Sequence, residues 1–260
     1  MNIRQIADFS PNYFEINREE RNYAAILFTT LCLPGNIERF LNRFDLNGKI
    51  SNDFGIYFEY SYLRDLWNRI SDEDIKKNIL KNKLEINEVD EILKQSAYEI
   101  NAKFGVAGKP SNKYIQFPGN WSISKYDKNF IDNSDFIKIC KFKWSFNIKP
   151  DIVIHLDKDH AICIEAKYEA VEGSYPVSLA EKKIFSNRGL GYVGQMELQK
   201  YMMENLLGIN TKFIFLVFKK ESSKTHKVIS WEEAFGSVDI QSLPQFAKNM
   251  VFKISNQAGA

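Results

Sequence analysis

The sequence is poor in the residues that build disulfide frameworks and zinc-binding knuckles. It has three cysteines, Cys32, Cys140 and Cys163, each in apolar surroundings, and only three histidines. No CxxC pair occurs, and no spacing of cysteine and histidine is typical of a zinc site. A disulfide-stapled domain and a zinc ribbon are therefore excluded, and we expect buried free thiols in a reducing compartment.

The chain also lacks a strong charge of one sign and a long apolar run. Its net charge is +2, so composition alone neither indicates nor excludes a nucleic-acid partner. No uncharged run approaches the ~18–20 residues of a membrane span, and the first ten residues do not resemble a signal peptide. These absences predict a cytoplasmic protein with no membrane partner. A phosphate-binding GxxxxGK[ST] loop is missing as well, so any motor would be a separate chain.

The composition predicts a well-filled core, and the spacing of apolar residues changes near Gly105. Hydrophobic residues make up 44% of the 260 residues, with 20 phenylalanines and 12 tyrosines. Apolar spacing predicts a helical N-terminal region at 1–104 that packs on a core at 105–260. We expect helices at 17–33, 37–44, 54–70, 86–104 and 190–207. We expect strands at 113–117, 121–125, 136–146, 152–156, 161–167 and 212–218.

The most informative stretch is 149–167, which reads KPDIVIHLDKDHAICIEAK. Two short apolar runs flank the polar turn 157–160, which is typical of a β-hairpin. Successive strand side chains alternate between faces, so Glu165 and Lys167 leave the second strand on one side. Asp151 opens the first strand and lies beside the end of the second. We therefore expect Asp151, Glu165 and Lys167 to meet at one edge of the sheet.

This group suits one kind of chemistry. Two neighbouring carboxylates favour a hard divalent cation such as Mg²⁺, with Mn²⁺ as a substitute. A bound cation polarises a phosphoryl oxygen, and a nearby lysine orients a water or offsets the charge on the phosphate. A surface salt bridge is the structural alternative, because exposed pairs of this kind are common and contribute about 0–1 kcal/mol.

The pattern of Pro150 and Asp151, then a hairpin, then Glu165-Ala166-Lys167 resembles the signature of the PD-(D/E)XK nuclease superfamily. The resemblance covers about 149–218. It implies an α/β (α+β) fold with a restriction-endonuclease-like core, a central mixed sheet flanked by helices. It implies a Mg²⁺-dependent hydrolase acting on nucleic acid, most simply a deoxyribonuclease in restriction or anti-phage defence. DNA repair and recombination are the alternatives within that class.

The resemblance also assigns roles to single residues. Asp151 and Glu165 would hold the metal, with the Ala166 carbonyl as a further ligand. Lys167 would position or deprotonate the attacking water. Because Lys167 lies at the sheet edge, we expect its truncation to cost little stability.

Other positions compete for a place in the site. Gln195 would orient the metal-bound water or contact the DNA backbone. Relatives often carry Tyr four residues later, where this chain has Gln199, so the exact branch of the superfamily stays open. Many relatives also carry one more acid on a helix before the sheet, and Glu20, Glu59 and Glu99 are all candidates for that role.

Basic residues near these motifs would line a nucleic-acid groove, although a solvated face explains them equally well. They are Lys138, Lys141, Lys143, Lys149, Lys182, Lys183 and Arg188. The second functional hypothesis is a catalytically silent binding module on the same fold, with structural carboxylates. DNA or RNA as substrate, endo- or exonuclease action, and a homodimer or separate partner protein all stay open.

Overall fold

The structure is a computed structural model that describes residues 20–46, 50–52, 54–106, 108–167, 172–218 and 226–257. The chain forms two compact units. The first contains Met1–Glu59, Asp151–Val171 and Lys212–Ala260, and the second contains Tyr60–Pro150 and Glu172–Thr211. The boundary that we expect between 104 and 105 falls inside the second unit.

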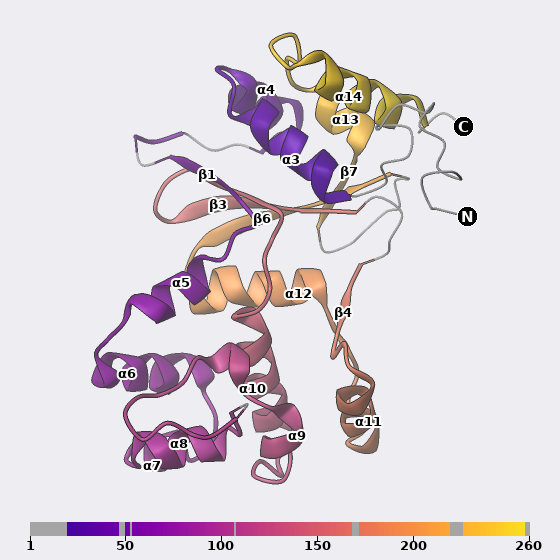
Figure 1. Cartoon of the computed structure of the whole chain (residues 1–260). Coiled ribbons are helices and arrows are strands. Elements are labelled where there is room, and N and C mark those ends of the chain that lie inside the picture. The colour runs from indigo at the N-terminus through magenta and orange to yellow at the C-terminus, as the bar shows by residue number, and fades with distance from the viewer. Residues whose placement is uncertain are drawn as a thin grey trace, which may run out of the picture. The chain divides into compact units, whose positions relative to one another are not determined.

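The first unit is a five-stranded mixed sheet with helices, drawn in Figure 1. Its helices are α3 (Glu20–Leu31), α4 (Asn36–Arg43), α13 (Trp231–Gly236) and α14 (Gln245–Gln257). Its strands are β1 (Gly55–Phe58), β2 (Ile152–His155), β3 (His160–Ala166), β6 (Asn210–Val217) and β7 (Lys227–Ser230). The strand order is β1-β2-β3-β6-β7, and the four helices gather on one side of the sheet. The predicted mixed sheet flanked by helices is confirmed.

The predicted hairpin is present and forms the centre of this sheet. β2 pairs antiparallel with β3, with Ile152 opposite Ile164 and Ile154 opposite Ile162. Asp157 closes the turn, because its Oδ1 accepts hydrogen bonds from the backbone N–H groups of Asp159 and His160, both at 2.7 Å. An aspartate that bonds backbone two and three residues ahead is a common way to fix such a turn.

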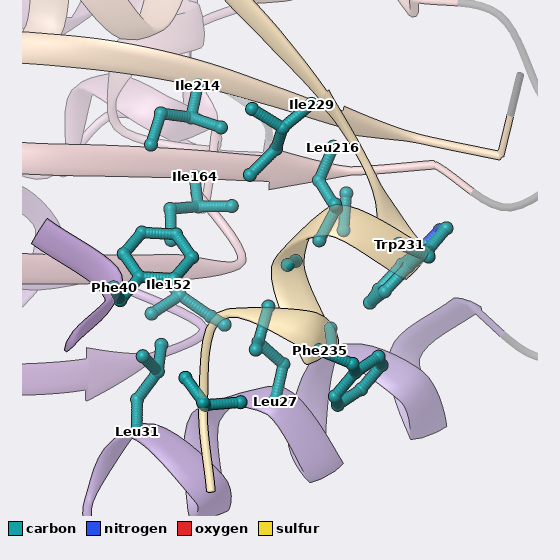
Figure 2. Packing of buried hydrophobic residues seen from close by; sticks show 14 of the residues in the cluster. Leu27, Leu31, Phe40, Ile152, Ile164, Ile214, Leu216, Ile229, Trp231 and Phe235 are labelled. Atoms are coloured by element: carbon teal, nitrogen blue, oxygen red, sulfur yellow. The ribbon is translucent and has the colours of Figure 1, made fainter. Parts of the chain in front are cut away.

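One face of the hairpin provides the apolar core of the first unit. Its inward side chains pack against α3, α4 and α13, as Figure 2 shows. The labelled core residues are Leu27, Leu31, Phe40, Ile152, Ile164, Ile214, Leu216, Ile229, Trp231 and Phe235. Full burial of one such aliphatic side chain contributes about 1.5–3 kcal/mol. Strand alternation then sends the residues between these core positions to the opposite face.

The second unit is mostly helical. Its elements are α5 (Tyr62–Arg69), α6 (Glu73–Leu84), α7 (Val89–Leu93), α8 (Ala97–Lys103), η1 (Pro118–Asn120), α9 (Ile123–Tyr126), α10 (Asn133–Ser145), β4 (Ser174–Tyr175), α11 (Leu179–Asn187), β5 (Val193–Gly194), α12 (Gln195–Lys200) and η2 (Tyr201–Leu206), a π-helix. β4 and β5 pair as a short antiparallel ribbon. Across the described part of the chain, no helix combines the length and apolarity that crossing a bilayer requires.

The expected strand at 136–146 is wrong, because this stretch belongs to helix α10. Asp132 caps the helix by accepting a hydrogen bond from the Asp135 backbone N–H at 3.0 Å. Phe136, Phe142 and Trp144 are buried, so apolar positions occur on more than one side of the helix. A helix buried on several sides has no single apolar stripe, and alternating lysine and aromatic residues then imitate strand periodicity.

The expected strands at 113–117 and 121–125 are also wrong. The first is a loop held by the buried Asn101, whose side-chain nitrogen donates to the carbonyls of Ser111 and Tyr114. The second contains α9. Backbone groups in this region therefore bond mainly to side chains and helical turns, and strand-like pairing is limited to an isolated bridge between Val106 and Trp121.

Two expected helices change their form, and a third starts late. The 54–70 stretch divides into β1 and α5, with Glu59 between them in a left-handed conformation at φ 51°. The 86–104 stretch divides into α7 and α8, because Ser96 begins a new capping box. In the 190–207 stretch the helix begins only at Gln195.

The buried Asn36 side chain offers a test of the first unit. Its Nδ2 donates to the carbonyls of Thr30 and Asp239, and its Oδ1 accepts from the Asp239 N–H at 2.7 Å. Asn36→Ala removes all three bonds and leaves buried backbone groups unpaired, so we expect a loss of about 2–4 kcal/mol in unfolding free energy. Thermal and denaturant unfolding measure it. Asn42→Ala, at an exposed position of the same helix, is the control and should change stability by less than about 0.5 kcal/mol.

Candidate functional site

The end of β3 carries a buried ion pair. Lys167 Nζ lies 2.6 Å from Glu165 Oε1, and only 11% of the lysine side chain and 2% of the glutamate side chain are exposed. The two residues share one face of the strand, as the alternation predicts. The ion pair is therefore not an exposed surface salt bridge, and its burial favours a larger loss of stability on truncation of Lys167 than the sequence suggested.

Asp151 joins this pair from the neighbouring strand. It precedes Ile152, which pairs with Ile164, so Asp151 stands opposite Glu165 in the antiparallel register. Its Oδ2 accepts a hydrogen bond from the backbone N–H of Ala166 at 2.8 Å. Its own carbonyl accepts from the Glu59 N–H at 2.9 Å. The expected meeting of Asp151, Glu165 and Lys167 at one edge of the sheet is present.

Both backbone groups of Lys167 are held by other strands and helices of the first unit. Its N–H donates to the Leu216 carbonyl on β6 at 2.7 Å. Its carbonyl accepts from the indole N–H of Trp231 at 3.0 Å. Trp231 is buried and also lies against Tyr23, one turn after Glu20 on α3. Trp231 is thus a structural part of the site that the sequence did not reveal.

Of the three candidate acids, Glu20 is the one that contacts the site lysine. Its Oε1 lies 3.3 Å from Lys167 Nζ. Glu59 forms an ion pair with Arg21 at 2.9 Å. Glu99, in the second unit, closes the capping box of α8 with Ser96. Lys167 therefore stands between two carboxylates, one from β3 and one from α3.

The electrostatics of the site are dominated by burial and by like charge. Burial, and then the neighbouring Glu165, raise the pKa of Asp151 to about 7, against the Ala166 N–H and Lys167, which lower it. Burial lowers the pKa of Lys167, but the attraction of Glu165, Glu20 and Asp151 outweighs burial and leaves its pKa raised. The lysine is therefore a cation at neutral pH, while Asp151 exchanges its proton near neutrality.

This donor set fits a hard divalent cation. Two carboxylates provide oxygen ligands, and burial together with the neighbouring Glu165 raises the pKa of Asp151, so its charged form lacks full compensation. Within the described ranges, no group of three or more His, Cys, Asp or Glu residues is arranged to hold a metal ion. Asp151 and Glu165 are thus the candidate metal ligands, and a bound Mg²⁺ would take its remaining oxygens from water and substrate.

Gln195 belongs to the second unit, whereas Asp151 and Glu165 belong to the first. It is the first residue of α12, and its backbone N–H donates to the Gly173 carbonyl at 2.8 Å. A side chain on Gly173 would collide with Gln195 Oε1, which would lie 2.7 Å from the new Cβ. Gln199, four residues on, is fully buried and does not belong to a solvated helix face.

Several of the basic residues that we expected to line a groove have structural partners. Lys138 donates to the Glu85 carbonyl at 2.6 Å, and Lys141 pairs with Glu197 at 2.6 Å. Arg188 pairs with Asp127 at 2.6 Å and lies over the Phe136 ring at 3.9 Å. Burial lowers the pKa of Lys143. These contacts fix α10 and α11 within the second unit.

Comparison of the chain with family models, curated proteins and solved structures gave no match.

The pKa of Asp151 gives a test that needs no substrate. Because its folded pKa of about 7 exceeds its ordinary value of 3.8, the folded protein holds an extra proton between these values, and charging Asp151 costs stability as pH rises. The asparagine of the Asp151→Asn variant cannot ionise. In EDTA, the unfolding free energy of the variant relative to the wild type should therefore rise by about 2–3 kcal/mol between pH 5 and pH 8. Unfolding curves of both proteins across this range measure the difference.

Parallel pH profiles for the two proteins would contradict this electrostatic account. Mg²⁺ provides a second measurement, since it should stabilise the wild type at pH 8 and have little effect on Asp151→Asn.

Proposed function

We propose that this protein hydrolyses phosphodiester bonds in DNA with a divalent metal, within restriction or anti-phage defence. The observation that supports this most is the convergence of Asp151, Glu165 and Lys167 in a largely buried cluster at the end of β3. Two neighbouring buried carboxylates favour a cation, and an adjacent lysine supplies a positioned proton donor or acceptor.

In this proposal Asp151 and Glu165 hold Mg²⁺, with Mn²⁺ as a substitute. The bound cation supplies Lewis-acid activation of the phosphoryl oxygen and of a water. Lys167 orients the attacking water and offsets negative charge that grows on the phosphate. Its ammonium is charged near neutrality, so electrostatic stabilisation is its larger contribution, and proton removal by Lys167 needs its pKa to fall when the cation binds.

Glu20 has a supporting role in this scheme. A cation held by Glu165 would weaken the ion pair of this residue with Lys167. Glu20, at 3.3 Å, then keeps a carboxylate beside the ammonium, so that Lys167 stays in place. Glu20 is thus a positioning residue and not a metal ligand.

A catalytically silent binding module is the second candidate. The observation that favours it is that the Lys167 ammonium pairs with both Glu165 and Glu20, as it would in a purely structural ion-pair network. Cleavage assays with matched variants separate the two candidates.

Lys167 is the residue whose replacement tests the chemistry most directly. Lys167→Ala should lower the cleavage rate by about 10²–10⁴-fold. It should also lower stability by about 3–5 kcal/mol, because it leaves Glu165 buried without its ammonium. Lys167→Arg keeps the positive charge but places its donors on a planar guanidinium, so it should cut faster than Lys167→Ala and more slowly than the wild type.

The measurement is cleavage of plasmid, linear duplex, single-stranded DNA and RNA with Mg²⁺ or Mn²⁺, beside melting curves. Wild-type activity in Lys167→Ala would end this mechanism. If the wild type cuts none of these substrates, the binding-module candidate is favoured.

Glu20→Gln tests the positioning role. We expect a fall of about tenfold in kcat with little change in KM, because Lys167 loses one of its two carboxylates while substrate contacts remain. Glu99→Gln is the matched control, since glutamine preserves a capping box and the substitution removes the same charge. Equal kcat values for the two variants would show that Glu20 does not hold Lys167 in place.

A further inference from the structure

The helix that supplies Glu20 also brings an arginine to the same edge of the sheet in the first unit. Arg21 follows Glu20 on α3, and successive side chains of a helix point about 100° apart. Glu20 contacts Lys167, which follows β3. Arg21 Nε instead lies 2.9 Å from Oε1 of Glu59, which follows β1. Two consecutive residues of α3 thus contact the ends of β1 and β3, which are not neighbouring strands.

Asp151 lies between these two contacts. It precedes β2, the strand between β1 and β3, and its carbonyl accepts a hydrogen bond from the Glu59 N–H at 2.9 Å. Asp151 also stands opposite Glu165 in the register of β2 and β3. Neighbouring strands lie about 4.8 Å apart, so the backbones at Glu59 and Glu165 are about 10 Å apart. The contacts of Arg21 and Lys167 therefore lie on either side of one candidate metal ligand.

The backbone of Glu59 is bent so that its carboxylate reaches this arginine. Phe58, the last residue of β1, faces the helices, because its ring centroid lies 5.6 Å from that of Phe28 on α3. Regular alternation would send Glu59 to the opposite face of the sheet. Its left-handed conformation, at φ 51°, breaks the alternation, and the carboxylate contacts Arg21 on α3 instead. Strain of this kind in a non-glycine residue is common at ligand-binding positions.

The ion pair leaves most of the Arg21 guanidinium accessible. Nε makes the contact with Glu59, and it carries only one of the five N–H donors of an arginine. The side chain of Arg21 is 67% exposed, whereas that of Lys167 is 11% exposed. The two terminal amino groups form a planar fork, whose geometry matches two oxygens of one phosphate. Arg21 is therefore both held in place and accessible at the rim of the candidate site.

We propose that Arg21 binds a phosphate of the DNA strand next to the phosphodiester that the metal would activate. The inference rests on the proposed function, because it names a substrate contact of that site. Glu59 holds the guanidinium at Nε, while the two terminal amino groups donate to the phosphate. Lys167 is buried and serves the reacting phosphate, whereas the exposed Arg21 serves its neighbour. A contact to phosphate carries no sequence information, so Arg21 contributes affinity and register.

A second arginine of the first unit provides a matched comparison. Arg39 Nη1 lies 3.9 Å from Asp239 Oδ2, and 59% of the Arg39 side chain is exposed. This pair joins α4 to the segment that follows α13, where Asp239 also bonds the Asn36 side chain. Its charges and its exposure resemble those of the Arg21–Glu59 pair, but its contacts are with α4 and not with the strand ends of the site.

The test compares four variants of the full chain: Arg21→Gln and Glu59→Gln, with Arg39→Gln and Asp239→Asn as matched controls. Fluorescence anisotropy with labelled duplex and single-stranded DNA, in EDTA to prevent cleavage, gives Kd at about 50–200 mM salt. Both ion pairs are largely exposed, so the melting temperatures of all four variants should stay close to that of the wild type.

We expect Arg21→Gln to bind DNA about tenfold more weakly whatever its sequence, with a salt slope smaller by about one. Glu59→Gln removes a carboxylate that competes for the guanidinium, so it should bind at least as tightly as the wild type. The two control variants should stay within about twofold of the wild-type Kd, because salt screens charges that lie away from the bound strand.

Four results would overturn the phosphate contact. Equal weakening in Arg21→Gln and Glu59→Gln would mean that Arg21 acts only by holding Glu59 beside β2. Equal weakening in Arg21→Gln and Arg39→Gln would mean that only total charge matters. The other two are unchanged binding in Arg21→Gln and a wild type that binds neither form of DNA.

Cleavage assays on the same proteins distinguish this contact from the chemistry. A wild type whose DNA binding depends on Arg21, but which never cuts, would refute hydrolysis and support the contact. If the wild type cuts, Arg21→Gln should raise KM about tenfold with little change in kcat, because the contact is made equally with bound substrate and transition state. A cutting wild type with unchanged Kd and KM in Arg21→Gln would refute the contact and leave hydrolysis supported.

Discussion

The end of the central strand β3 depends on the buried charges of Glu165 and Lys167, which must be compensated inside the protein. Removing Glu165 and Lys167 from water costs several kcal/mol per ion, and only close pairing with further hydrogen bonds recovers it. The pair is closed at 2.6 Å, and Glu20 adds a second carboxylate to the lysine. Because Glu20 is on α3 and Glu165 on β3, the compensation links regions more than a hundred residues apart in the chain. The site can therefore form only when the first unit has folded.

The same strand that carries the charges also builds the core. Ile164 and Ala166 point into the cluster with α3 and α13, while Glu165 and Lys167 alternate with them. A slip of one residue in the β2–β3 register would exchange these faces and place Glu165 and Lys167 in the apolar core. Core packing thus fixes which way the carboxylates point. The β2–β3 register therefore determines both the packing of the core and the position of the candidate site residues.

Much of this edge could be predicted from the sequence, because the signals are local. The 149–167 stretch combines alternation with a turn residue, so the hairpin and the shared face of Glu165 and Lys167 follow from strand geometry. The choice of Glu20 could not be predicted, because nothing local distinguishes it from Glu59 and Glu99. Trp231 gave no signal either, since a buried tryptophan near a strand end is ordinary core.

The errors also have a physical cause. The 136–146 stretch alternates lysine with aromatic residues, which is typical of a strand. Because α10 is buried on more than one side, this alternation does not distinguish a strand from a helix. A better signal was present in the spacing of Asp132 and Asp135, which is typical of a helix start. In the 111–116 loop, side-chain hydrogen bonds from Asn101 replaced strand pairing. Contacts of that kind depend on tertiary structure and leave little trace in a local pattern.

The indole of Trp231 has an optical consequence. The chain has four tryptophans, and Trp67, Trp121 and Trp144 all belong to the second unit. A protein in which those three are replaced by phenylalanine, excited at wavelengths that tyrosine does not absorb, would emit from the indole bonded to the Lys167 carbonyl. Its fluorescence would then report on the candidate site without an added dye, and events in the second unit would contribute no emission of their own.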